Sequence, residues 1–246
     1  MVTSNSLLAL LTLPLLTTSS HNTQLNIHIK IATPINNTIS ESNIDLSSQL
    51  ITPSDQQLDF ITKQDPHATL YLTMFDSKHI TSGSLQKASE LALKTAFSNP
   101  TCSNSPQMEI GTTFTASGAY AMLSVTNIAC LQLLSDSLVN ATSSFVAPYA
   151  KEKIPSWVYD LPPDQQQGKI DMIHLYGSPN VFESFDPHVT LLADSTNITE
   201  LAALVTSNQD LPVLDSPVVI VGFGKVGPYG SVLKGQDILP PVTLGI

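Results

Sequence analysis

The sequence contains one short motif twice, and each copy opens a segment with the composition of a β-strand. Residues 65–70 (DPHATL) and 186–191 (DPHVTL) are identical at five of six positions. Alternate residues of a strand share a face, so the histidine and threonine of each copy point the same way, while the residue between them points into the core. The preceding proline cannot donate to a strand ladder, which suits a strand start or edge. We therefore expect two imidazole and hydroxyl pairs.

The other four histidines lack this context. His21 and His79 are followed by a threonine two residues later, but neither has a preceding proline, and in neither case does a hydrophobic residue follow the threonine. His28 and His174 have no such surroundings, and we assign them no role. A lone histidine in a strand is more often structural than catalytic, but two matching copies favour a functional interpretation of His67 and His188.

Hydrophobic periodicity predicts a mixture of strands and helices. The predicted strands are residues 26–31, 67–75, 114–125 and 188–193, followed by a closing hairpin from 218–223 and 230–233. The predicted helices are residues 84–97, 128–138 and 199–206. Residues 147–185 contain the only tryptophan, Trp157, and several prolines, among them Pro155, Pro162 and Pro163. We interpret them as an insertion with one helix near residues 170–175.

The composition indicates one folded domain over residues 21–246. Hydrophobic residues make up 42% of the 246 residues and charged residues 12%, which is enough apolar material for a core. No G-x-G-x-x-G follows the first predicted strand and no P-loop occurs, so a nucleotide-cofactor fold is poorly supported. We expect no cofactor.

The first 20 residues have the profile of a signal peptide. Their apolar run, residues 7–16, is about half as long as the roughly 20 residues that a membrane span needs, so we expect no membrane anchor. Glycosylation sequons at Asn36, Asn140 and Asn197 are useful only in a eukaryotic secretory pathway. The only two cysteines, Cys102 and Cys130, predict one structural disulfide in an oxidising compartment. We expect a secreted glycoprotein.

The charge argues against binding of long nucleic acids. The formal net charge is −10, and all ten basic residues are lysine, with no arginine anywhere in the sequence. Polyanions are held by basic grooves, and phosphates most often by the two parallel hydrogen bonds of arginine. A phosphate-containing substrate is therefore expected to be small.

The chain resembles the 2H phosphoesterase superfamily, which includes RNA 2′,3′-cyclic phosphodiesterases, the so-called 2′-5′ RNA ligases and cyclic nucleotide phosphodiesterases. The paired H-x-T motifs, the strand and helix order of each half and the late segment Gly227-Pro228-Tyr229 carry the resemblance. It implies a bilobal, duplicated α+β fold whose two antiparallel sheets flank a central cleft, with helices outside. It also implies catalytic roles for His67 and His188 and phosphate binding by Thr69 and Thr190.

The expected chemistry is metal-independent hydrolysis of a cyclic phosphodiester, such as a 2′,3′-cyclic nucleotide. One histidine takes a proton from water while the other protonates the leaving oxygen, and imidazole titrates close enough to neutrality for both tasks. Threonine hydroxyls would donate to the phosphate oxygens. Tyr71 shares the predicted strand face of His67 and is either a base-stacking residue or a core tyrosine.

Three other functions stay open on the sequence. The first is a secreted protein that binds a nucleotide or another small anion in the cleft without turnover. The second is a metalloenzyme, although no H-E-x-x-H or comparable ligand set occurs, and we expect no metal. The third is a structural or adhesion module, which leaves the repeated motif unexplained. We expect a monomer. The sequence leaves open the physiological substrate, the product isomer and the acid and base assignment.

Overall fold

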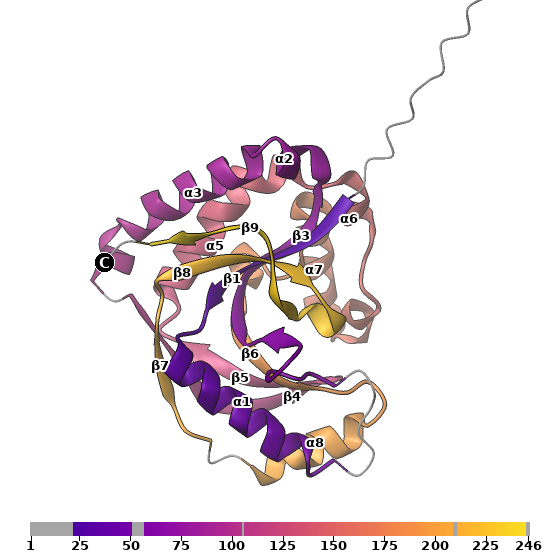
Figure 1. Cartoon of the computed structure of the whole chain (residues 1–246). Coiled ribbons are helices and arrows are strands. Elements are labelled where there is room, and N and C mark those ends of the chain that lie inside the picture. Colours follow the sequence, from indigo (N-terminus) through magenta and orange to yellow (C-terminus); the bar gives the residue numbers. More distant parts are fainter. Residues whose placement is uncertain (1–21, 51–56, 105, 209–210, 245–246) are drawn as a thin grey trace, which may run out of the picture.

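The computed structural model describes residues 22–50, 57–104, 106–208 and 211–244, and the expected leader at residues 1–20 lies outside them. The described chain forms a five-stranded and a four-stranded antiparallel sheet with α-helices packed against them (Figure 1). The expected α+β fold with two antiparallel sheets is confirmed. None of the described helices is long and apolar enough to cross a bilayer.

The five-stranded sheet has the strand order β2, β9, β8, β1, β3. Its strands are β1 (Asn22–Lys30), β2 (Gln64–Asp65), β3 (His67–Asp76), β8 (Ile220–Val226) and β9 (Val232–Thr243). The alternation predicted in β1 is present, since Leu25, Ile27 and Ile29 have no exposed surface. The polar residues between them therefore point to the opposite face, where Lys30 lies directly across from His67 in the register of β1 and β3.

This sheet curls because its two edge strands are joined by a single residue. Strand β2 forms one edge and β3 the other, and only Pro66 separates Asp65 from His67. Consecutive Cα atoms are about 3.8 Å apart, so the opposite edges must approach each other at this point. The curl places the first motif beside the turn between β8 and β9.

The four-stranded sheet has the order β6, β5, β4, β7. Its strands are β4 (Gln107–Ser117), β5 (Tyr120–Thr126), β6 (His188–Ala193) and β7 (Leu214–Pro217). Residues 114–125, predicted as one strand, instead form parts of the β4–β5 hairpin, with Ser117 paired to Tyr120. The reason is the two-residue turn between them, in which Gly118 has a φ of 55°, a conformation that glycine adopts without steric cost.

Helices cover the outside of both sheets. Helices α3 (Ser84–Phe97) and α5 (Ala129–Thr142) contact each other, and α5 contacts β3. On the other side, α1 (Thr33–Ser47) contacts β6 and β7, and α8 (Ile198–Ser207) contacts β4 and β5. Figure 1 shows these two helix pairs at opposite sides of the two sheets. The expected arrangement, with helices outside, is confirmed.

The two halves of the sequence do not correspond to the two sheets. The chain passes from β1 of the five-stranded sheet to α1, which packs on the four-stranded sheet, and then returns to β2 and β3. Helix α1 lies between the predicted strands 26–31 and 67–75, where no element was predicted. Its signal is Pro34 in the first turn and a buried side at Ile39, Asn43 and Leu46, spaced four and three residues apart.

The segment interpreted as an insertion packs against β3. It contains α6 (Pro148–Glu152), η2 (Ser156–Asp160), α7 (Pro163–Tyr176) and η3 (Phe182–Ser184), so its predicted helix is present but begins seven residues earlier than residue 170. The Ala147 N–H donates to the Met74 carbonyl at 2.9 Å. The remaining short helices are α2 (Ser77–Thr81), α4 (Pro100–Ser103), η1 (Ser143–Phe145) and η4 (Pro228–Gly230).

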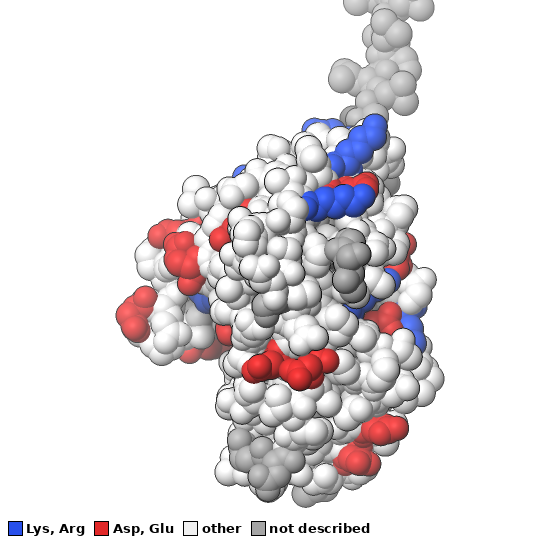
Figure 2. Space-filling model, turned by 90° about the vertical axis from the view of Figure 1, so that its left-hand side faces the viewer, with Lys and Arg blue, Asp and Glu red and all other residues white. Residues whose placement is uncertain are grey.

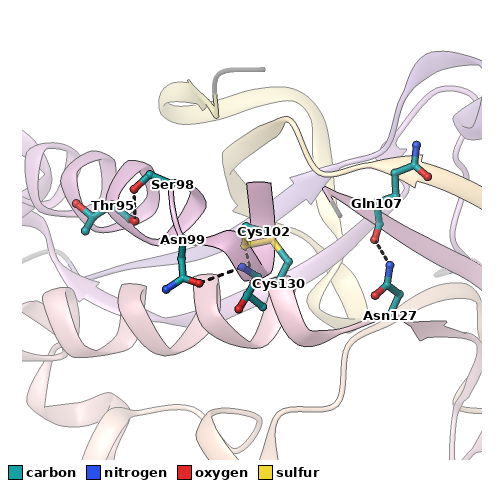
Figure 3. Close-up of a disulfide and its surroundings, with 8 residues drawn as sticks. Thr95, Ser98, Asn99, Cys102, Gln107, Asn127 and Cys130 are labelled. Carbon is teal, nitrogen blue, oxygen red and sulfur yellow. Dashed lines mark hydrogen bonds between the residues drawn. A yellow bond between two sulfur atoms is a disulfide. The ribbon is translucent and has the colours of Figure 1, made fainter. Parts of the chain in front are cut away.

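The predicted disulfide is present. Cys102 in α4 and Cys130 in the first turn of α5 are bonded to each other, and both are buried (Figure 3). The bond joins the end of the α3 and α4 segment to the helix that packs behind β3. It therefore fixes two elements of the helical layer that supports the first motif.

Replacing both cysteines by alanine should lower the free energy of unfolding by about 3 to 4 kcal/mol, because the bond closes a loop with a sequence separation of 28 residues. Urea denaturation of the oxidised wild type and the double variant measures the difference. A reducing agent should destabilise the wild type and leave the variant unchanged. Equal stabilities of the oxidised wild type and the cysteine-free variant would contradict a stabilising role.

Candidate active site

The two copies of the repeated motif meet, although each belongs to a different sheet. Strand β3 is an edge of the five-stranded sheet, β6 is an edge of the four-stranded sheet, and the two strands contact each other. His67 and His188 are the first residues of these strands, and both are half-buried. Burial lowers the pKa of His67, and the charge of His188 adds to this shift, so the two rings lie near each other.

The aspartate of each motif fixes the ring of its histidine through its backbone carbonyl. Nδ1 of His67 lies 2.8 Å from the carbonyl oxygen of Asp65, and Nδ1 of His188 lies 2.9 Å from that of Asp186. A carbonyl oxygen only accepts, so Nδ1 must carry the proton in both rings. Each neutral ring therefore keeps its lone pair on Nε2, which is the atom available for proton transfer.

Asn26 of β1 joins the first motif to the turn between β8 and β9. Its side-chain nitrogen Nδ2 lies 3.2 Å from Nε2 of His67, 3.1 Å from Oγ1 of Thr69 and 3.1 Å from the Gly230 carbonyl oxygen. The side chain has no exposed surface. The hydroxyl of Thr69 accepts from Asn26, so its own proton is left to donate to a ligand.

A third histidine, His28, packs against His67. Their ring centroids are 5.3 Å apart with an edge-on geometry, and His28 Nδ1 donates to the Asn26 carbonyl at 3.0 Å. Burial lowers the pKa of His28 to about 3, assisted by the charge of His67. Burial also lowers the pKa of His67 to about 4. Both rings are therefore neutral at neutral pH.

Sequence reasoning missed Asn26 and His28. The available signal was the alternation of residues 26–31, which places Asn26, His28 and Lys30 on one face of a strand whose other face is buried. Asn26 and His28 are themselves buried, so both faces of this strand are covered. Polar residues of these types are seldom fully buried. That pattern, combined with a motif histidine on the neighbouring strand, marks a polar site between two sheets.

The second motif offers a similar pair. Thr190 follows His188 by two residues in β6, so both side chains lie on the same face of that strand, and Thr190 is half-buried. Thr190 pairs with Met122 and His188 with Ser124 in the register of β5 and β6. The structure therefore places one imidazole and one hydroxyl on each of the two contacting strands.

Tyr71 does not belong to this face. It has no exposed surface, its ring packs edge-on against Phe75, and its hydroxyl donates to the Tyr176 carbonyl at 2.5 Å. The physical reason is the register shift between Ile27 and His28 of β1, opposite which both Leu70 and Tyr71 are buried. This irregularity breaks the alternation on which the stacking interpretation depended, so the core interpretation of Tyr71 holds.

Tyr229 bridges the two sheets beside this site. It lies in the turn between β8 and β9 with a φ of 57°, a conformation that is costly for a bulky side chain. Its hydroxyl lies 3.1 Å from Oγ of Ser195, and its ring packs edge-on against Tyr120 of β5 with centroids 5.9 Å apart. The turn that receives Asn26 at Gly230 is therefore also tied to the four-stranded sheet.

Basic groups near the site are lysines. Nζ of Lys30, which lies opposite His67, forms a 2.5 Å ion pair with Asp237 of β9. Nζ of Lys169 donates to Oδ1 of Asn180 at 2.7 Å and to the Ser184 carbonyl at 3.0 Å. Burial lowers the pKa of Lys169, and the charge of Asp186 opposes this shift. Lys169 is thus a half-buried amine close to the second motif.

A hollow of about 430 Å³ borders the first motif. It is lined by Gln64, which precedes Asp65 in β2, by Pro228 of the β8–β9 turn and by Lys63 and Lys234. On the face shown in Figure 2, acidic and basic side chains lie in small separate groups on a mostly uncharged surface. That face carries no continuous basic stripe of the kind that binds long polyanions.

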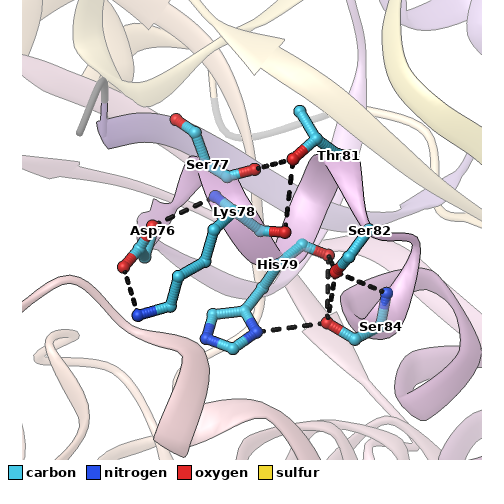
Figure 4. Close-up of polar contacts among 7 residues, drawn as sticks. All are labelled: Asp76, Ser77, Lys78, His79, Thr81, Ser82 and Ser84. Carbon is cyan, nitrogen blue, oxygen red and sulfur yellow. Dashed lines mark hydrogen bonds and ion pairs between the residues drawn. The ribbon is translucent and has the colours of Figure 1, made fainter. Parts of the chain in front are cut away.

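Of the remaining histidines, His79 has structural contacts, His174 is exposed and His21 lies outside the described residues. Nδ1 of His79 lies 3.1 Å from Oγ of Ser84 (Figure 4), and its ring stacks on Phe145 with centroids 4.4 Å apart. His174 is exposed on α7. Within the part of the chain that the structure describes, no group of three or more His, Cys, Asp or Glu side chains is arranged to hold a metal ion.

The three sequon asparagines differ in accessibility. Asn140 is exposed near the end of α5, whereas Asn36 of α1 is half-buried. Asn197 is half-buried before α8, and its Nδ2 donates to Oδ2 of Asp194 at 3.1 Å. Asn140 therefore offers the freest amide nitrogen for a glycan.

A scan against models of known protein families finds no match, and a search of curated proteins finds no relative. The resemblance to the 2H superfamily therefore depends on the sequence features alone: the repeated motif, the order of strands and helices and the segment Gly227-Pro228-Tyr229.

Gly222 of β8 provides the room that His28 needs. A Cβ atom at Gly222 would lie 2.6 Å from Nε2 of His28 and 2.5 Å from Cε of Lys30. We expect Gly222→Ala to lower the free energy of unfolding by about 1 to 3 kcal/mol through overpacking. Gly168→Ala is the matched control, because it lies within α7 with nothing within 4 Å, and should stabilise by about 0.5 to 1 kcal/mol. Thermal denaturation of both variants tests this contrast.

The lowered pKa values of His28 and His67 predict a loss of stability in acid. Below about pH 6.5 both histidines are protonated in the unfolded chain but stay neutral in the folded chain. The unfolded state therefore binds more protons, and the free energy of unfolding falls as the pH drops towards 4. The slope is on the order of 1 kcal/mol per pH unit and histidine. His28→Gln should weaken this dependence, and the exposed control His174→Gln should not. Urea denaturation from pH 4 to 7 measures it, and identical slopes in all three proteins would contradict the assignment.

Proposed function

We propose that this protein is a metal-independent phosphodiesterase of the 2H type that hydrolyses a small cyclic phosphodiester, such as a 2′,3′-cyclic nucleotide. The observation that carries the proposal is the meeting of His67 and His188 on two contacting strands, each with Nδ1 bonded to a carbonyl and its lone pair on Nε2. Displacement at phosphorus needs a base and an acid on opposite sides, and two histidines on different, contacting strands could supply them.

We assign His67 as the base and His188 as the acid. With a pKa of about 4, His67 is the neutral ring that a base requires at neutral pH. Its Nε2 takes a proton from water as the water oxygen bonds to phosphorus. The bond from phosphorus to one ring oxygen of the substrate breaks, and that oxygen takes a proton from the protonated His188. Proton exchange with solvent then restores both rings.

The remaining polar groups suit a bound phosphate. The hydroxyl protons of Thr69 and Thr190 would bond the two non-bridging oxygens as negative charge shifts onto them. The negative charge of a bound phosphate stabilises the protonated form of His67. Substrate binding therefore strengthens His67 as a base. Lys63 and Lys234 in the bordering hollow add positive charge to an otherwise acidic protein.

The proposed setting is the secretory pathway of a eukaryote. The leader expected at residues 1–20, the disulfide and the exposed sequon at Asn140 support secretion of a glycoprotein. The lack of arginine and the mostly uncharged face of Figure 2 support a small substrate over a long nucleic acid. We further propose that the protein acts as a monomer, without a cofactor or a membrane anchor.

The test is hydrolysis of a panel of 2′,3′-cyclic and 3′,5′-cyclic mononucleotides in the presence of EDTA. His67→Ala and His188→Ala should each reduce kcat/KM by about a hundredfold to ten-thousandfold. The double variant should be scarcely slower than the worse single variant, because acid and base act as a unit. His174→Ala is the matched control and should retain full activity.

Two outcomes would overturn the proposal. Loss of turnover in EDTA would indicate a metalloenzyme. Absence of turnover on every substrate, from folded protein that still binds nucleotides, would indicate the alternative of a secreted binding protein for nucleotides or other small anions. Identification of the product as a 2′- or 3′-phosphate would define which ring oxygen leaves.

A further inference from the structure

We infer that Asn26 is a positioning residue that locks His67 in its Nδ1–H form and yields Nε2 to the attacking water. The catalytic consequence rests on the proposed function, but the lock itself is a property of the folded protein. Asn26 comes from β1, outside both copies of the repeated motif, and reaches His67 and Thr69 of the first copy together.

The Gly230 carbonyl fixes the orientation of the Asn26 amide. Nδ2 lies 3.1 Å from this carbonyl oxygen, which only accepts, so a donor must face it. The reversed amide would place Oδ1 against the carbonyl oxygen and two acceptors would meet. Nδ2 therefore also faces Nε2 of His67, and Nε2 must be the acceptor. The carbonyl of Asp65 requires the same form from the other side of the ring, because it accepts from Nδ1.

The Asn26 amide has fewer protons than acceptors around it. Nδ2 carries two protons, and three acceptors lie within 3.2 Å: Nε2 of His67, Oγ1 of Thr69 and the Gly230 oxygen. If a water molecule takes Nε2 of His67, both amide protons still have partners. Release of the base therefore leaves no unpaired donor behind. Oδ1 of Asn26 is buried and has no partner among the described residues. No hydrogen bond to Oδ1 therefore holds the amide in place when its Nδ2 gives up Nε2 of His67 to a water molecule.

The groups around His67 define what a change at Asn26 should do. The titratable side chains that influence it or face it are His28 and Lys30 from β1 and His188 from β6, and Lys30 is paired with Asp237. None of the three supplies a negative charge to Nε2. In Asn26→Asp a carboxylate would take the place of the amide, and an opposite charge at this distance raises the pKa of a histidine by about 1 to 3 units.

The first experiment uses the unmodified protein. Nitrogen NMR of ¹⁵N-histidine-labelled protein, with the His67 signal assigned by its loss in His67→Gln, reports which ring nitrogen carries the proton. We expect a protonated Nδ1 and an unprotonated Nε2 throughout pH 5.5–8. A protonated Nε2 in this range would overturn the inference without any change at Asn26, which keeps the test valid if a variant fails to fold.

The second experiment titrates His67 in Asn26→Asp. We expect its midpoint to rise by at least one pH unit, and the acidic limb of the kcat/KM profile to move by the same amount. Asn43→Asp is the matched control, since Asn43 is another buried asparagine with one bond to a backbone carbonyl, that of Leu191, and should leave the titration unchanged. A midpoint that is unmoved in folded Asn26→Asp would overturn the inference.

These results separate the two proposals. If His67 has the expected form and shifts in Asn26→Asp while no phosphodiester is hydrolysed, the lock stands and the proposed function fails. If phosphodiesters are hydrolysed while the titration midpoint of His67 is the same in Asn26→Asp as in the wild type, the function stands and the lock fails.

Discussion

Pro66 is the only residue between the two edge strands of the five-stranded sheet, and this connection shapes the whole site. Because β2 and β3 lie at opposite edges, the sheet must curl until its edges approach each other at Asp65 and His67. The curl brings the β8–β9 turn to Asn26, and the same turn reaches the four-stranded sheet through Tyr229. A flat sheet with the same strands would keep β1 beside β3 but would leave His67 without the β8–β9 turn. The site is a consequence of closure.

Closure also explains the electrostatics of the site. His67 and His28 are packed between strands and therefore lose hydration of their charged forms, which is the main reason for their low pKa values. The bonds from Nδ1 to backbone carbonyls then fix which nitrogen is free. Burial keeps the His67 ring neutral, and the hydrogen bond from Nδ1 leaves the lone pair on Nε2. Together they make Nε2 a proton acceptor. In the proposed reaction, a base held in this way would need neither a metal ion nor a neighbouring carboxylate.

Much of the fold was accessible from local patterns. The helix at residues 84–97 and the strand at 188–193 were predicted with the boundaries that the structure has, because each has a clear period and a clear change of composition at its ends. Helix α1 was missed because its buried side includes Asn43, a polar residue that donates to the Leu191 carbonyl. The β4–β5 turn was missed because Gly118 alone marks it. The partner of Asn43 is distant in sequence, whereas the turn is a local feature with a single weak signal.

The sequence by itself determined the repeated motif, the strand that follows each copy, the cysteine pair and the acidic, arginine-free composition. These are properties of residue identity and local spacing. Tertiary structure alone decided that the two motifs meet across different sheets, that Tyr71 turns into the core and that Asn26 and His28 join His67. The reason is physical: a bulge, a curl and a crossing between sheets each change which side chains share a face. Those changes follow from pairings between residues that lie tens of positions apart or more.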